Sequence, residues 1–403
     1  MSAKDSVGQR VYFDHNATSP LRTRVRKAMI DVMDVSGNPS SIHTEGRKAR
    51  AIIEYSREKI AALVGAGQHD IMFTSGGTEA NNTALSPGLV AEQTERREGA
   101  LCFVSGIEHP SVHRGGRFKP SQIRYIPVNE AGVVDLDAFE ELLEANQIMA
   151  SNRSDMKQPF MVSVMLANNE SGVIQPVTEI AGLVLERGGL MHCDAVQALG
   201  RMPFDIGSLG ADLVTITAHK IGGPKGVGAL IGPAVDRVLN DPLVSGGGQE
   251  LGRRAGTEDP VSIAGFAAAA EIACEELADR EMTRFLRDRL ETRLNGAISD
   301  LIVFAEDADR LDNTSFLAVP GLSAENLVIA LDLDGISISS GAACSSGKVK
   351  KSHVLEAMGF DTEIAQCAFR VSVGPQNWLD DIDRLVISIE KNMKRSRGTK
   401  ALG

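Results

Sequence analysis

The sequence predicts an α/β protein built on a mostly parallel sheet, and two patterns carry this prediction. Seven short β-rich runs recur along the chain, with helical or glycine-rich segments between most of them. Their apolar residues are consecutive rather than alternating, which is typical of strands that helices cover on both faces. The seven predicted strands are residues 71–75, 101–105, 123–128, 161–166, 190–195, 213–218 and 227–232.

Beyond the last of these strands the pattern changes to that of a smaller unit. Residues 261–296 read as one long helix, with Leu286, Leu290 and Leu294 on one face. Further strands, separated by helices, indicate an α+β domain. They are expected within residues 313–320, 336–344 and 368–374. The predicted parts are an N-terminal segment over 1–14, a large domain over 15–263 and a small C-terminal domain over 264–403.

Composition limits the classes of function. The chain has 403 residues, 43% of them hydrophobic, and a formal charge of -11, so it can build a sizeable core but lacks basic surface for nucleic acid or anionic membranes. No apolar run is long enough to span a membrane, and no signal-peptide pattern opens the chain. The five scattered cysteines are expected to be reduced, and residues 394–403 to be a frayed basic tail. We therefore expect a cytoplasmic protein with a small-molecule substrate.

A lysine after one predicted strand is the first candidate for chemistry. In "TITAHKIGGPKG", Lys220 follows the strand at 213–218, and ligands of parallel sheets bind at the carboxyl ends of strands. Thr217 and His219 add hydrogen-bonding side chains, and the following glycines let the backbone approach an anion. These residues predict a phosphate site beside an amine. The alternative is a surface lysine that only closes a strand.

A second turn indicates the same kind of ligand. In "IMFTSGGTEANN", Gly76 and Gly77 separate a strand from a helix that opens at Thr78 and Glu79. Free N–H groups at a helix N-terminus bind phosphate. The alternative is a threonine capping an ordinary strand-to-helix turn. The spacing fits neither the P-loop nor the dinucleotide-binding pattern, so neither nucleotide hydrolysis nor dinucleotide binding is supported.

Pyridoxal phosphate joins the two features chemically. A lysine amine condenses with an aldehyde to an imine, and this cofactor carries both an aldehyde and a phosphate. Asp194, at the end of the strand at 190–195, offers a carboxylate for the ring nitrogen, and Gln197 can reach a ring oxygen. A carboxylate there keeps the ring protonated as an electron sink. The alternative role for Asp194 is a helix N-cap.

These residues lie in motifs that span nearly the whole chain. In chain order the motifs are FTSGGTEANN, EHPSV, ANNESGVIQP, HCDAVQALG, TAHKIGGPKGVGAL, GGGQELGRRAGTED, SSGAACSSG and FRVSVG, and YFDHNATSP and GNPSSIHTEGR near the N-terminus agree. The series resembles the cysteine desulfurases of the NifS/IscS type among the class V aminotransferases. The resemblance implies the type I fold of pyridoxal phosphate enzymes, a homodimer, and conversion of L-cysteine to L-alanine with the sulfur left on an enzyme cysteine.

The resemblance also implies roles for matched residues. Lys220 holds the cofactor and moves the substrate Cα proton, and His109 stacks on the ring and assists proton transfer. His109 and His113 have metal-ligand spacing but no third ligand nearby, so no metal site is expected. The other implied cofactor contacts are Gly77, Thr78, Asn168, Asp194, Gln197, Thr217, His219 and, from the neighbouring subunit, Thr257.

Two matched residues are implied to bind the substrate. Asn168 contacts the cofactor or the substrate carboxylate. Arg370 grips that carboxylate, for which a planar bidentate donor is suited. The alternative for Arg370 is a structural ion pair.

The nucleophile implied by the resemblance is Cys344. Glycine and serine surround it in "SSGAACSSGKVKK", which predicts a mobile, exposed loop, and the nearby lysines favour its thiolate. The other four cysteines lie among apolar or strand residues and are expected to be buried hydrophobes. They are Cys102, Cys193, Cys274 and Cys367.

The sequence therefore predicts a cysteine desulfurase that delivers a Cys344 persulfide to an acceptor protein, an iron–sulfur scaffold or another sulfurtransferase. The "KVKK" run after Cys344 departs from the family pattern and leaves the pathway open between iron–sulfur assembly and, for example, tRNA thiolation. One alternative is a related pyridoxal phosphate lyase or aminotransferase, such as a selenocysteine lyase, which would not need Cys344. Another is a sulfur-carrier or interaction protein with a vestigial site.

Overall fold

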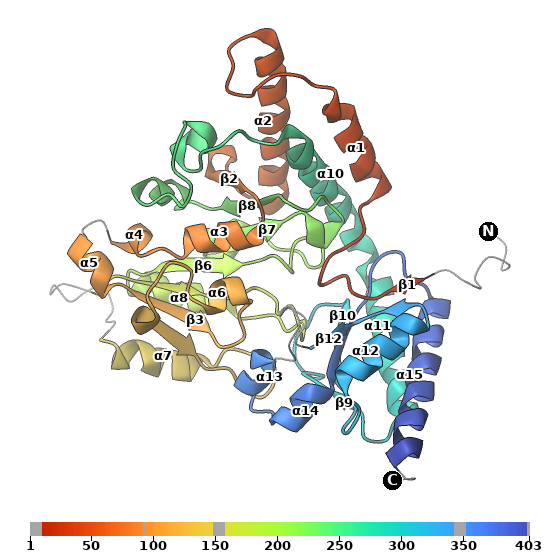
Figure 1. Ribbon diagram of the computed structural model, residues 1–403. Helices are drawn as coiled ribbons and strands as arrows, with labels where there is room; N and C mark the ends of the chain where they lie inside the picture. Colours follow the sequence, from red (N-terminus) through yellow and green to blue (C-terminus); the bar gives the residue numbers. More distant parts are fainter. Residues whose placement is uncertain (1–9, 92–93, 148–157, 342–351, 401–403) are drawn as a thin grey trace.

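The computed structural model describes residues 10–91, 94–147, 158–341 and 352–400. Figure 1 shows a larger unit around a central sheet and a smaller unit in blue tones, where the last helix packs beside a second sheet. The N-terminal segment runs along the smaller unit before the chain enters the larger one. The prediction of an α/β protein with a smaller α+β part is confirmed.

The large sheet has seven strands in the order β2-β8-β7-β6-β5-β3-β4. Only β8 runs antiparallel to its neighbours, and the other pairings are parallel. The strands are β2 (Ile71–Thr74), β3 (Leu101–Ser105), β4 (Ile123–Ile126), β5 (Phe160–Ser163), β6 (Leu190–Asp194), β7 (Leu213–Thr217) and β8 (Gly228–Ile231). Each coincides with a predicted strand to within three residues at either end, which confirms the mostly parallel seven-stranded sheet.

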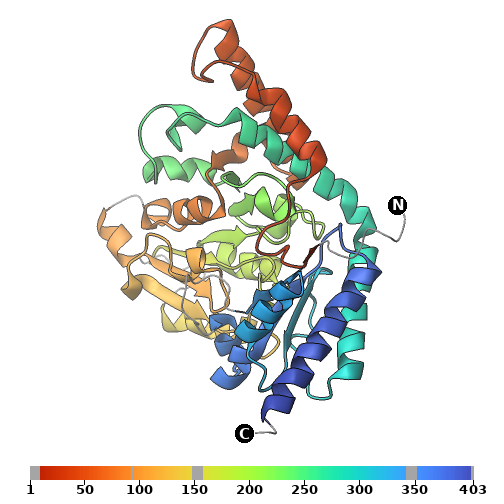
Figure 2. The same ribbon diagram turned by 45° about the vertical axis from the view of Figure 1, so that its right-hand side comes forward.

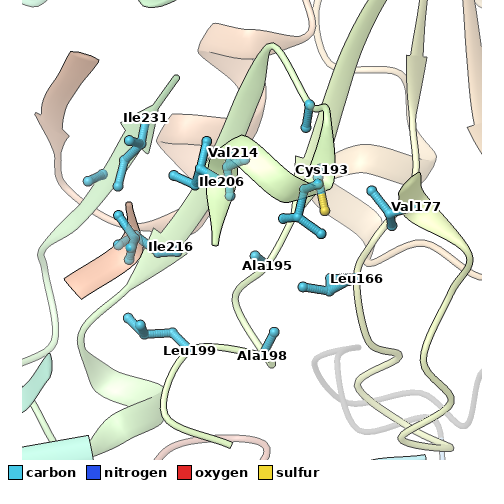
Figure 3. Close-up of a cluster of buried hydrophobic side chains, with 14 of the residues drawn as sticks. Leu166, Val177, Cys193, Ala195, Ala198, Leu199, Ile206, Val214, Ile216 and Ile231 are labelled. Carbon is cyan, nitrogen blue, oxygen red and sulfur yellow. The ribbon is translucent and has the colours of Figure 1, made fainter. Parts of the chain in front are cut away.

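Both faces of this sheet are buried, because alternate residues of each strand enter different clusters. On β6 and β7, Met191, Cys193 and Val214 pack into one core, which Figure 3 shows as a group of closely packed side chains. Leu190 and Leu213 enter the other core, on the opposite face. Helices therefore cover the sheet on both sides, as the consecutive apolar runs predicted.

The helices of the larger unit flank the sheet. They are α1 (Thr23–Met33), α2 (Thr44–Val64), α3 (Gly77–Ala84), α4 (Pro87–Val90), α5 (Thr94–Gly99), α6 (Pro110–His113), α7 (Leu136–Ala145), α8 (Val177–Glu186), α9 (Ile206–Leu209) and α10 (Pro260–Glu276). Their ends follow local rules: Asp259 caps α10 by accepting from two backbone N–H groups, and α2 ends at Gly65, whose φ of 70° suits a glycine. No helix within the described ranges is long and apolar enough to cross a membrane.

The single long helix predicted over 261–296 is wrong, because the chain forms two helices there. A 3₁₀ turn, η6 (Leu277–Asp279), separates α10 from α11 (Arg280–Ala297), and Figure 2 shows the change of direction between them. α10 packs through Phe266 into the large core, whereas α11 packs through Leu290 into the small one. The helical run is interrupted at the point where its buried residues stop packing into the large core and begin to pack into the small one. The domain limits at 15 and 263 stay predictions.

The smaller unit combines an antiparallel sheet, in the order β12-β13-β10-β9, with long helices. Its strands and helices are β9 (Ile302–Val303), β10 (Thr314–Ala318), β12 (Ser339–Ser340), β13 (Ala368–Ser372), α12 (Ala324–Leu333), α13 (His353–Ala357), α14 (Thr362–Cys367) and α15 (Leu379–Lys400). β1 (Val11–Tyr12) pairs in parallel with β11 (Ile336–Ser337), which ties the N-terminal segment to this unit.

The predicted frayed tail over 394–403 is wrong as far as Lys400, because α15 continues to that residue. Ile389 and Met393 anchor the preceding turns in the core, and Lys and Arg, which follow them, are good helix formers.

Candidate active site

Lys220 lies just beyond the carboxyl end of β7, in the 3₁₀ turn η3 (His219–Ile221). Its amine is half-buried. Nζ donates to the carbonyl oxygens of Asn16, at 2.6 Å, and Ala17, at 3.0 Å. The N-terminal segment therefore crosses this edge of the large sheet and contacts the lysine directly.

Asp194 is the last residue of β6, the strand beside β7, and only 5% of it is exposed. Oδ2 accepts from Asn81 Nδ2 at 2.8 Å, and Oδ1 accepts from the backbone N–H of Val196 at 3.0 Å. Since β6 and β7 are parallel, Asp194 and Lys220 come to the same edge of the sheet. The segment after Asp194 is a series of turns rather than a helix, so the helix-cap alternative is wrong.

His109 precedes the short helix α6 and caps it. Its Nδ1 lies 2.8 Å from Ser111 Oγ and accepts from the Ser111 backbone N–H at 3.2 Å. Burial is the main cause that lowers the pKa of His109, and the charge of Lys220 lowers it further, while Asp194 acts in the opposite direction. His109 therefore lies within electrostatic range of both predicted cofactor-binding residues and is neutral at physiological pH.

The glycine turn after β2 fits closely against the ends of β6, β7 and β8. A Cβ on Gly77 would lie 3.2 Å from Val196 Cγ2, and one on Gly228 would lie 2.8 Å from the backbone carbon of Gly76. A glycine is needed at position 228 because two backbone segments meet there, and a Cβ at position 77 would crowd the side chain of Val196. Thr78 is exposed in the first turn of α3, whose N-terminal N–H groups are suited to an anion.

Thr217 and His219 have hydrogen-bond partners within the chain. Thr217 Oγ1 donates to the carbonyl of Val227 at 3.0 Å, and His219 Nδ1 lies 3.3 Å from Thr18 Oγ1. Burial, followed by the charge of Lys220, lowers the pKa of His219 to about 4. His219 is therefore a neutral hydrogen-bonding group beside the lysine.

Gln197 and Asn168 are buried and bonded in the same way. Gln197 Nε2 donates to the carbonyl of Asn16 at 3.1 Å. Asn168 Oδ1 accepts from the backbone N–H of Glu170 at 2.8 Å, and its Nδ2 donates to the carbonyl of Ile107 at 2.9 Å. In this state the amide of Asn168 shapes its own turn, and its contact with cofactor or substrate stays a prediction.

Arg370, on β13 of the smaller unit, is 4% exposed and reaches back to the large sheet edge. One terminal nitrogen donates to the carbonyl of Asn169 at 2.6 Å, and the other donates to Asp14 Oδ1 at 2.7 Å. Nε is buried and makes no hydrogen bond to any described residue. The structural ion pair considered from the sequence exists, yet the guanidinium keeps an unused donor.

Thr257 and Cys344 complete the predicted set. Thr257 is exposed, on a segment that the ion pair of Arg254 with Glu79, at 2.9 Å, holds to the first turn of α3. Cys344 and the lysines after it lie outside the described residues.

The prediction that the four described cysteines are buried hydrophobes is confirmed for three of them and is wrong for Cys274. Cys102, Cys193 and Cys367 are buried, and Cys274 is half-buried. Burial raises the pKa of the Cys102, Cys193 and Cys274 thiols, which disfavours the thiolate needed for nucleophilic attack.

The gathered residues fit pyridoxal phosphate. The edge formed by β6 and β7 offers a buried carboxylate at Asp194 for a ring nitrogen, an amine at Lys220 for an aldehyde, and the N-terminus of α3 for a phosphate. No group of histidine, cysteine and acidic side chains in the described part of the chain could hold a metal ion.

Three residues that the sequence analysis left without a role belong to this site. Asp14 and Asn169 hold Arg370, and Asn16 accepts from both Lys220 and Gln197. Asp14 and Asn16 stand in YFDHNATSP and Asn169 in ANNESGVIQP, so their only signal was membership of those motifs.

Comparisons with known proteins agree with this geometry. The chain matches the family described as Aminotransferase class-V over residues 11–385. A relative from Dictyoglomus turgidum, named cysteine desulfurase IscS, is 37% identical over 395 residues, which cover 96% of each chain. A solved structure of a NifS-like protein from Rickettsia africae has a TM-score of 0.83 at 34% identity, covering 96% of this chain and 100% of the other. Another, described as SspA in complex with cysteine, has a TM-score of 0.73 at 27% identity, covering 91% and 100%.

Proposed function

This chain belongs to the class-V aminotransferase family, and from that premise we propose that it is a pyridoxal phosphate-dependent cysteine desulfurase. It converts L-cysteine to L-alanine and leaves the sulfur on an enzyme thiol. The observation that carries the proposal is the meeting of Lys220, Asp194 and His109 at one sheet edge, which residues 14–17 connect to Arg370.

Each residue has a distinct task in this reaction. When bound, pyridoxal phosphate supplies an aldehyde that captures an amine and a ring that withdraws electrons from the substrate. Asp194 presents a buried negative charge to the ring nitrogen, and Lys220 Nζ, once released by the substrate amine, removes the Cα proton. Arg370 orients the substrate carboxylate, for which the planar fork geometry of its guanidinium is suited.

We assign the sulfur-accepting thiol to Cys344. The chemistry of the described cysteines supports this assignment, because burial disfavours the thiolate of Cys102, Cys193 and Cys274. Delivery of the Cys344 persulfide to an acceptor, an iron–sulfur scaffold or another sulfurtransferase, in the cytoplasm, belongs to the same proposal.

A homodimer that completes each site with Thr257 of the neighbouring subunit is also part of the proposal. Thr257 is exposed, and the same part of the surface carries exposed apolar side chains at Leu251 and Ile42. Gln249 Nε2 and Ser40 Oγ, 3.5 Å apart, bring the two loops together. Exposed apolar groups of this kind are typical of association surfaces.

Two pairs of variants test the proposal. Lys220→Ala should abolish the visible absorbance of the lysine-bound cofactor, whereas Lys225→Ala, an exposed lysine in the same turn, should keep it. Cys344→Ser should keep that absorbance but stop persulfide formation and turnover of cysteine, whereas Cys274→Ser should keep the absorbance, persulfide formation and turnover. An unchanged spectrum in Lys220→Ala would refute the cofactor assignment, and full turnover by Cys344→Ser would refute the role of that thiol.

A further inference from the structure

A line of hydrogen bonds connects two of the active-site residues through side chains that have no assigned role. Asn81, on α3, donates from Nδ2 to Asp194 Oδ2 at 2.8 Å and to Ser111 Oγ at 2.9 Å. Ser111 Oγ in turn lies 2.8 Å from His109 Nδ1. Asn81 is 1% exposed and its bond to Asp194 is buried, whereas Ser111 is half-buried.

The position of each proton in this line follows from the donors available. The carboxylate of Asp194 can only accept, so the amide of Asn81 must turn its NH₂ toward it. The amide oxygen of Asn81, Oδ1, is buried and makes no bond to a described residue, so the amide is oriented by its nitrogen. Both N–H bonds of Asn81 are then used, and Ser111 Oγ is the acceptor of one.

Ser111 consequently has its own hydroxyl proton available for His109. The O–H donates to Nδ1, and the Ser111 backbone N–H donates to the same atom at 3.2 Å. A nitrogen that accepts from two donors carries no proton of its own. We propose that Asn81 and Ser111 are positioning residues, which link His109 to Asp194 and hold the imidazole proton on Nε2.

The charges around His109 agree with a neutral ring. Asp194 approaches it from β6, Lys220 from η3 and His353 from α13. Lys220 and His353 oppose a positive charge on the ring, as does burial, and Asp194 alone favours it. The line of hydrogen bonds then selects which neutral form is present.

This inference rests on the proposed function and adds to it the atom that carries the proton. With Nδ1 occupied, His109 Nε2–H can donate a hydrogen bond to the cofactor or substrate, but Nε2 cannot accept a proton from Cα. Removal of the Cα proton is therefore left to Lys220 alone.

The test measures the tautomer directly. In the full chain with ¹⁵N-labelled histidine, with and without pyridoxal phosphate, His109 should show an unprotonated Nδ1 and a protonated Nε2 at neutral pH. A His109→Gln variant assigns the signal. Ser111→Ala should reduce the preference for this tautomer about fivefold, because one hydrogen bond to Nδ1 is lost. Ser111→Thr keeps the hydroxyl and should restore the preference.

A second variant and a control keep the result specific. Asn81→Ala frees the Ser111 hydroxyl to donate elsewhere and should shift the tautomer ratio in the same direction, which also serves if Ser111→Ala does not fold. Ser388→Ala removes a serine distant from the site, whose Oγ lies 2.6 Å from Asp334 Oδ2, and should leave His109 unchanged.

Two results would overturn the proposal. One is a protonated Nδ1 in the unmodified chain. The other is a tautomer ratio of His109 that does not differ between the unmodified chain, Ser111→Ala and Asn81→Ala. The proposed function fails separately. If the unmodified chain formed no alanine from cysteine while showing the expected tautomer, the desulfurase assignment alone would be wrong.

Discussion

Two arginine–carboxylate pairs of the smaller unit differ in how many hydrogen bonds join the guanidinium to the carboxylate. Arg310 and Glu291 meet fork to fork, at 2.7 and 2.8 Å, with both side chains less than 10% exposed. Arg370 uses one oxygen of Asp14, at 2.7 Å, and Asp14 is 21% exposed. Its remaining bond goes to a backbone carbonyl, and its Nε is left without a described partner.

The difference distinguishes a structural pair from the arginine that we propose binds the substrate carboxylate. In the complete fork both terminal nitrogens and both carboxylate oxygens are paired, so each charge is met by the other. The incomplete fork of Arg370 costs stability, because a buried donor stays unused, and a single oxygen of Asp14 meets the guanidinium charge only in part, which leaves the charge able to attract a second carboxylate. The four experiments below test this comparison, in order of decreasing expected effect.

Breaking the complete fork should produce the largest loss of stability. Arg310→Leu leaves Glu291 buried without its counter-charge, and we expect the free energy of unfolding to fall by about 3 to 5 kcal/mol in urea denaturation. Arg24→Leu, which removes an exposed arginine paired with Glu275, is the control and should have no measurable effect. A loss in Arg310→Leu no larger than in this control would contradict the structural role.

Changing the incomplete fork should instead affect activity. Arg370→Lys keeps the charge but loses the planar donor, and we expect kcat/KM for L-cysteine to fall about a hundredfold, the equivalent of one or two charged hydrogen bonds. The free energy of unfolding should change little. A variant with normal kcat/KM would show that Arg370 does not bind the substrate carboxylate.

Removing the partner of Arg370 should have a smaller effect on the same parameter. Asp14→Asn keeps an acceptor near the guanidinium but removes the charge, and we expect KM to rise about tenfold with little change in kcat, because Arg370 is held less firmly. Asp332→Asn, at the exposed pair with Arg10, is the matched control. Equal steady-state constants for the two variants would contradict the positioning role.

A buried carboxylate without an arginine fork extends the comparison. Ser352 Oγ donates to Glu170 Oε2 at 2.6 Å, and burial raises the pKa of Glu170 to about 7, in spite of this bond and of Arg370. Because the folded-state pKa lies above the unfolded value, the native state prefers the neutral acid, and stability falls as the pH rises.

Glu170→Gln should remove that dependence. Between pH 6 and 8 we expect the unmodified chain to lose roughly 1 kcal/mol more of its free energy of unfolding than the variant does. Chemical denaturation at several pH values measures this difference. Parallel pH profiles for the two chains would mean that Glu170 stays ionised in the folded state.

Much of the fold was predictable because its signals are local. Residues 101–104 are an unbroken apolar run, and the structure forms β3 over those four residues and Ser105. The break at η6 was not predictable in this way, because Leu277–Asp279 contains no proline or glycine. The helix ends there only because α10 and α11 bury their faces in different cores.

In the candidate site, too, the positions of the reactive residues were predictable from local sequence and their hydrogen-bond partners were not. The positions of Lys220 and Asp194 at strand ends follow from short stretches of sequence, since parallel neighbouring strands end at a common edge. The partners of these residues do not: Asn16 lies 204 positions from Lys220, and Asn81 lies 113 positions from Asp194.

The sequence by itself determined the order of strands and helices along the chain and the chemical types of the reactive side chains, because periodicity and turn residues act over a few positions. Only the tertiary structure decided which donor meets which acceptor. Asp14 and Arg370 are 356 positions apart, and their contact exists because β1 and β13 both join the smaller unit. The unused Nε of Arg370 and the proton on His109 Nε2 depend on such distant contacts, which no local pattern specifies.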